Sequence, residues 1–315
     1  MKKIFFAVVA VVAMASCSKD EVLELNREQI GFGDVFVDNA TRADYSNPLT
    51  LIKQFNVYGT VTGTVTGNQT PVALFGGNGA VVSRGDKAYG VAWDCDETEH
   101  WIPGADYQFE AVVDGTITNG KIAYTIGADP DNDGVNDLLY AKKEVNDATA
   151  TQGLVEFNFT HLLSKVGFSF TNGVTDNDAY TFNVTDVSFK GHDTEGTYTI
   201  STSKWDDVIT TSTTALSFGA AGAVVDATKV YAPTTHQIIP GEQTLAITIT
   251  YDIVYNGNIM SQGVTTTKNL THPFEQNKVY NIAVVLPAPG NPIQFSVDET
   301  NGVGAWVDGG EAEVQ

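Results

Sequence analysis

The sequence predicts an all-β protein built from antiparallel β-sandwiches. Short segments in which apolar and polar residues alternate recur along the chain, Gly, Thr and Asn are frequent between them, and helical periodicity is nearly absent. Alternation with a period of two puts one face of each strand in a core, and many such short strands are typical of sandwiches. The alternating segments are 107–113, 121–126, 180–189, 196–202, 245–255 and 279–286.

The first residues have the pattern of an export signal. Lys2 and Lys3 precede an apolar run over residues 4–13, which is too short to cross a bilayer as a permanent helix and suits a cleaved signal peptide over residues 1–16. Ala15 and Ser16 followed by Cys17 resemble a bacterial lipobox, in which the cysteine becomes the acylated first residue. The alternative is a secreted protein in which Cys17 is incidental.

Composition limits the partners and the chemistry. The chain has 315 residues, with 17 Lys and Arg against 38 Asp and Glu, and a formal charge of -21. This acidic excess repels phosphate backbones and anionic lipids, and leaves proteins, neutral glycans or cations as partners. Once Cys17 is acylated, Cys95 is the only thiol, so no internal disulfide can form. The neighbouring carboxylates disfavour a reactive Cys95 thiolate.

The N-terminal part after the leader contains a strand and a candidate cleavage site. Residues 29–37 alternate, with Ile30, Phe32 and Phe36 expected on one face. The polar stretch 38–44 follows, and Arg42 in it suits a trypsin-like cut, because nicking concentrates in exposed polar loops. The alternative is an ordinary linker.

One turn signal and two short helical turns are expected farther on. Asn119-Gly120 precedes the alternating run 121–126 and is a strong hairpin signal. Residues 141–150 and 161–166 are the only stretches that could form short helical turns. We place a domain boundary near Gly153, between a polar stretch and an apolar run.

The C-terminal end carries two apolar runs without an evident partner. Residues 286–292 contain three prolines and predict an extended hinge. Beyond it, residues 293–297 and 303–307 alternate, but the segment is too short to form a domain. Such strands need another sheet to pair with.

Several motifs together resemble the fimbrillin family of lipoprotein pilins and fimbrillin-like proteins of Bacteroidetes-type bacteria. They are the lipobox at Cys17, the Thr41-Arg42-Ala43 site, and the stretches 157–166 and 274–280. The terminal run 293–297 and Trp306 also match the family's last strands, and Ser18 to Glu21 resembles a surface-export signal of its lipoproteins.

The resemblance implies two tandem transthyretin-like β-sandwich domains and a strand-exchange assembly. On this hypothesis residues 1–16 are the signal peptide, 17–42 a lipidated segment with a removable strand, 43–153 and 154–290 the two sandwiches, and 291–315 the donor strand. The precursor is an outer-membrane lipoprotein at the cell surface, and an arginine-specific protease cuts between Arg42 and Ala43. The donor side chains are Ile293, Phe295, Val297, Val303, Ala305, Trp306 and Val307.

Two non-enzymatic functions lead, and an enzyme is the third and weakest hypothesis. The first is a structural pilus subunit whose partners are copies of itself or related pilins. The second is a lipid-anchored adhesin, or a minor or tip fimbrillin, that binds glycan or protein without building a stalk. The five histidines have no metal spacing, and no catalytic motif or Walker loop is present in the sequence.

One acidic loop has the composition of a calcium site. Asp129, Asp131, Asp133 and Asp137 stand at positions 1, 3, 5 and 9 of an EF-hand-like pattern, and Val135 can offer its carbonyl. Position 12 is Tyr140 in place of the bidentate Glu, so any affinity should be weak, about 0.1 to 1 mM. A solvated acidic turn is the alternative, because Asp, Asn and Gly are also ordinary turn residues.

Overall fold

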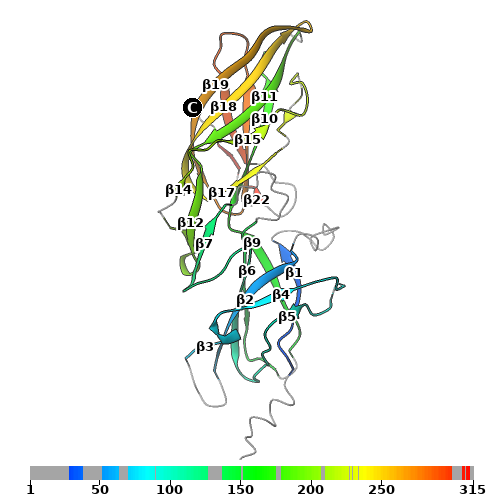
Figure 1. Ribbon diagram of the computed structural model, residues 1–315, viewed down its shortest axis with the longest axis vertical. Coiled ribbons are helices and arrows are strands. Elements are labelled where there is room, and N and C mark those ends of the chain that lie inside the picture. Colours follow the sequence, from blue (N-terminus) through cyan, green and yellow to red (C-terminus); the bar gives the residue numbers. More distant parts are fainter. Residues whose placement is uncertain are drawn as a thin grey trace, which may run out of the picture.

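The computed structural model is an elongated all-β molecule, which confirms the all-β part of the predicted fold class (Figure 1). The pairing is not purely antiparallel, because β1 (Phe32–Val37) runs parallel to β9 (Val155–His161) and β10 (Ser164–Asn172) runs parallel to β20 (Lys278–Leu286). It describes residues 28–37, 52–63, 70–88, 90–126, 137–149, 152–174, 179–206, 210–226, 228, 230–232, 234–299, 307–308 and 310–312. Within these ranges the strands form four sheets, and two single 3₁₀ turns are the helical elements. No helix in the described part of the chain has the length and hydropathy needed to span a membrane.

The first sheet contains the N-terminal strands. Its order is β1-β9-β8-β6-β2-β4-β5, and β3 also pairs with β2. Alternation is clear in β2, where every second side chain enters an aromatic core that this sheet encloses with the loops around it. The strands are β1 (Phe32–Val37), β2 (Gln54–Thr62), β3 (Val72–Ala73), β4 (Ala80–Ser83), β5 (Asp94–Cys95), β6 (Asp106–Val113), β8 (Leu139–Val145) and β9 (Val155–His161).

Two sheets enclose a second core in the C-terminal part. One has the order β16-β10-β20-β21-β23, with β17 on β10 and β22 on β20, and the other has the order β15-β11-β18-β19. The long β18–β19 hairpin reaches the far end of the molecule (Figure 1). The strands are β10 (Ser164–Asn172), β11 (Tyr180–Lys190), β15 (Leu216–Gly219), β16 (Val230–Tyr231), β17 (His236–Ile238), β18 (Gly241–Tyr255), β19 (Asn258–Phe274), β20 (Lys278–Leu286), β21 (Gln294–Glu299), β22 (Val307–Asp308) and β23 (Gly310–Ala312).

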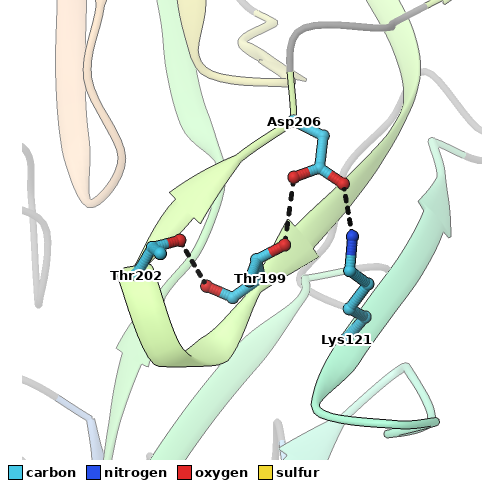
Figure 2. A network of polar contacts seen from close by, with 4 residues as sticks. All are labelled: Lys121, Thr199, Thr202 and Asp206. Atoms are coloured by element: carbon cyan, nitrogen blue, oxygen red, sulfur yellow. Dashed lines mark hydrogen bonds and ion pairs between the residues drawn. The ribbon is translucent and has the colours of Figure 1, made fainter.

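A fourth sheet joins the two parts. It consists of β13 (Lys204–Trp205), β12 (Asp193–Thr199), β14 (Thr210–Thr211) and β7 (Lys121–Thr125), and β7 comes from the N-terminal part. Beneath it lies a third, smaller core of residues from both parts. At its edge, Lys121 Nζ lies 3.0 Å from Asp206 Oδ2, and the Thr199 hydroxyl donates to the other oxygen of Asp206 (Figure 2).

Of the hairpin predicted at Asn119-Gly120, the turn is present but the strand pairing is not. Both residues have positive φ, at 52° and 70°, and the backbones of Thr118 and Lys121 exchange two hydrogen bonds across the turn. The strand that follows, β7, pairs with β12 and not with β6. The predicted turn therefore forms, but the strand after it pairs with a distant strand and not in a local hairpin.

The two expected helical turns are also wrong. The stretch 141–150 contains most of β8, which pairs with β6 along its whole length, and 161–166 contains the end of β9 and the start of β10. Sheet pairing outweighs weak local helix preference in both places. The chain passes from the first sheet to the second between His161 and Ser164.

Candidate functional site

The most distinctive site is the place that β1 occupies in the N-terminal sheet. β1 is an edge strand of its sheet and runs parallel to β9, with Phe32 opposite Val155 and Val35 opposite Phe157. On its other side, residues 28–34 bond to the loop over residues 90–101. We call these two walls, β9 and residues 90–101, the β1 seat.

Backbone hydrogen bonds hold this segment on both sides. Removing it leaves donors and acceptors unpaired on both walls, which costs free energy unless water or another strand replaces them. The bonds run from Ile30 N–H to Glu99 O at 2.8 Å, Trp93 N–H to Phe32 O at 2.8 Å, Trp101 N–H to Glu28 O at 3.1 Å and Val155 N–H to Gly31 O at 2.8 Å.

Side chains of the segment complete the aromatic core. Phe32 is fully buried, and Ile30 and Val35 are 2% and 4% exposed. The Phe32 ring contacts four others, with centroid distances between 5.9 and 6.4 Å, and these are the rings of Phe55, Phe75, Phe109 and Phe157. β1 therefore supplies part of the core and does not merely cover it.

A bulge changes the buried face within β1. Its register to β9 shifts between Phe32 and Val35, so Val35 and Val37 pack on the core while Phe36 is half-buried. The expectation that Phe36 shares the face of Ile30 and Phe32 was therefore wrong, because the extra residue reverses the alternation. At the bulge, the carboxylate of Asp34 accepts a hydrogen bond of 2.9 Å from Gly90 N–H.

The C-terminal segment begins within its own part of the molecule. β21 pairs antiparallel with β20, and Ile293 and Val297 are 1% and 0% exposed in the second core. Phe295 is partly buried against the same core. Lys268 of β19 donates a hydrogen bond to the Ile293 carbonyl and lies 5.7 Å from the Phe295 ring centroid.

Several predicted site residues lie outside the described residues. They are Cys17, Arg42, Ala43, Asp129, Asp131, Asp133, Val135, Val303, Ala305 and Trp306. The backbone of Val307 is described in β22, where it lies opposite Lys278 of β20.

The one described member of the acidic loop is engaged by a histidine. Asp137 Oδ2 lies 2.6 Å from His161 Nδ1, and both side chains are largely buried. Burial lowers the pKa of nearby Lys165, and the charge of Asp137 opposes that shift. In the described ranges, no three His, Cys, Asp or Glu side chains are grouped to hold a metal ion.

The structure also adds features that the sequence did not reveal. The loop over residues 90–101 forms one wall of the seat and buries Trp93 and Trp101, although no alternation marks it. Burial is the main cause that raises the pKa of the Cys95 thiol in this loop, and Asp96 and Glu97 raise it further. A neutral thiol is a poor nucleophile, as the sequence indicated.

Both the sequence and the fold resemble those of known proteins. A family model described as fimbrillin-like matches residues 41–300. The chain is similar to a crystal structure of a fimbrial protein from Bacteroides vulgatus at a TM-score of 0.58 and 13% identity, over 86% of this chain and 99% of that chain. A protein from Bacteroides ovatus assigned to cell adhesion aligns at 0.54 and 17% identity, over 87% and 98%. A search of curated proteins finds no match.

Proposed function

The chain belongs to the fimbrillin-like family, and from this premise we propose that it is a structural fimbrial subunit that polymerises head to tail by strand exchange. The family is structural and adhesive, and the protein is a fimbrial or cell-adhesion protein and not an enzyme. In this proposal the precursor is a lipoprotein acylated at Cys17, cut between Arg42 and Ala43 at the cell surface. Its partners are copies of itself or related pilins.

The observation that supports the proposal is the way β1 fills its seat. The three side chains Ile30, Phe32 and Val35 are almost fully buried, and their burial contributes roughly 5 to 9 kcal/mol. Arg42 follows this strand closely in the sequence, so a cut there separates β1 from the rest of the chain. A seat without β1 has an exposed apolar stripe and unpaired backbone groups, a state that favours addition of another strand.

The donor in this proposal is the segment 291–315 of the next subunit. Donor and seat are different surfaces, so their contact is heterologous and propagates as a filament. Within one subunit, Ile293 just before β21 and Val297 within it are already buried, so donation of that run requires β21 to leave β20. The second run, 303–307, follows it along the chain.

The test uses material sheared from the native cell surface. Its intact mass is measured, and the protein is run on a denaturing gel with and without heating. A species that begins at Ala43 and is released from a ladder only by heating supports the strand-exchanged pilin. A monomer that begins at acylated Cys17 overturns it.

A groove on the joining sheet supports the second candidate, a surface adhesin that binds glycan. It is lined by the partly buried Trp205 and by polar side chains that include Asp193, Asp206, Glu242 and Gln243. An aromatic ring beside carboxylates suits a neutral sugar, which stacks on the ring and donates hydroxyl hydrogen bonds to the carboxylates. An anchored monomer in the test above, together with retention on immobilised neutral oligosaccharides, would favour this candidate.

A further inference from the structure

Leu154 supplies the nearest atoms to the outward face of Gly31, just before β1, and of Gly33 within it. A Cβ atom added to Gly31 would lie 2.7 Å from Leu154 Cδ2, and one added to Gly33 would lie 3.0 Å from Leu154 Cβ and 3.3 Å from its Cδ1. Neither glycine has a positive φ, so the backbone conformation does not demand glycine. Both positions need glycine for space.

The two positions differ in how strictly they exclude a side chain. Leu154 Cδ2 is a terminal methyl of a side chain that is 39% exposed, so it can rotate away from the place of Gly31. Leu154 Cβ is fixed to the backbone, and the next residue, Val155, is held by its hydrogen bond to Gly31. A side chain at the place of Gly33 therefore meets an atom that can yield only if the backbone of Leu154 shifts, and Glu156 Cγ adds a second contact at 3.4 Å.

We propose that Leu154 is a steric gate that selects the stretch Gly302-Val303-Gly304 of a second copy as the strand that enters the vacated seat. This inference rests on the proposed strand exchange. Within residues 291–315, 302 and 304 are the only glycines two positions apart, as are Gly31, just before β1, and Gly33 within it. The earlier run carries Gln294 and Ser296 at alternate positions, and either would meet Leu154.

The gate also sets the register of the donor. Because the hydrogen-bonding groups of both walls are placed for β1, the donor runs in the same direction, with Gly302 in the place of Gly31 and Val303 in that of Phe32. The bulge then brings Trp306 to the place of Val35. A smaller side chain replaces Phe32, and a larger one replaces Val35. A shift by two residues would put Trp306 on Leu154 Cβ, so that register is excluded.

The experiment measures polymer formation by the full chain after an arginine-specific cut. Unheated denaturing gels report the heat-sensitive ladder, and the thermal stability of each uncut chain is the folding control. Gly304→Val is expected to reduce the ladder about 10-fold or more, even though valine favours strands, and Gly302→Val is expected to reduce it less. Adding Leu154→Gly, which removes the obstructing Cβ, restores the ladder of Gly304→Val, whereas Leu154→Ala retains that atom and does not.

The outcomes separate the gate from strand exchange itself. Absence of a ladder from the cut wild-type chain overturns the proposed function. A wild-type ladder that Gly304→Val leaves unchanged, or whose loss Leu154→Gly fails to reverse, overturns the gate and leaves strand exchange standing.

Discussion

Phe32→Ala should destabilise the uncut chain more than any other truncation in β1. The Phe32 side chain is fully buried, and its ring lies within 6.4 Å of four other aromatic rings. Removing a buried phenylalanine from such a core costs about 3 to 5 kcal/mol, the sum of lost transfer free energy and the cavity that remains. This is a large part of the 5 to about 15 kcal/mol that typically stabilises a domain.

The assay is urea-induced unfolding followed by tryptophan fluorescence. Trp93 and Trp101 lie in the core that β1 completes, so their emission reports the N-terminal part once Trp205 and Trp306 are replaced by Phe in every chain compared. Phe36→Ala is the matched control, because it removes the same side chain from the same strand at a half-buried position. We expect this control to cost about 1 kcal/mol. Equal losses for the two variants would refute the assignment of Phe32 to the core and of β1 to the seat.

Three further predictions concern other parts of the molecule. In the uncut chain, Gly33→Val should lower the melting temperature more than Gly31→Val, and equal shifts would contradict the fixed position of Leu154 Cβ. Burial, with a smaller effect from His236, lowers the pKa of His192 from 6.5 to about 4, so the unfolded state binds more protons between these values. Stability should therefore fall by up to about 3 kcal/mol as the pH drops through that window. His192→Asn should remove this part of the pH dependence in equilibrium unfolding, and an unchanged profile would count against it. Lys268→Ala should speed amide hydrogen exchange in β21, because it removes the contacts to Ile293 and Phe295, whereas Lys278→Ala, which loses a pairing with Glu275, should not.

Local patterns predicted the strands well because their alternation matches burial. Each of the six alternating segments overlaps a strand, in order β6, β7, β11, β12, β18 and β20. What they did not predict is pairing. The Asn119-Gly120 turn forms as expected, but β7 leaves its neighbour in sequence for β12, since its buried Ile122 and Tyr124 complete the core between the two parts.

The candidate site was predictable in one half only. Residues 29–37 were predicted as a strand because Ile30 and Phe32 alternate with polar or small residues. The bulge that puts Val35 and not Phe36 on the core face depends on the register to β9, which no local pattern encodes. The wall over residues 90–101 is held by hydrogen bonds to β1 from a distant part of the chain. The requirement for glycine at positions 31 and 33 comes from their contact with Leu154, which is distant in the sequence.

The joining sheet determines how the molecule responds to tension. β7 and β12 run roughly along the long axis and pair at five positions, from Lys121 opposite Thr199 to Thr125 opposite Glu195 (Figure 1). A pull along that axis loads these hydrogen bonds in shear, so they must rupture together and not one after another. The ion pair between Lys121 and Asp206 adds a cross-link at one end of this contact. The junction between the two parts is thus built to resist stretching.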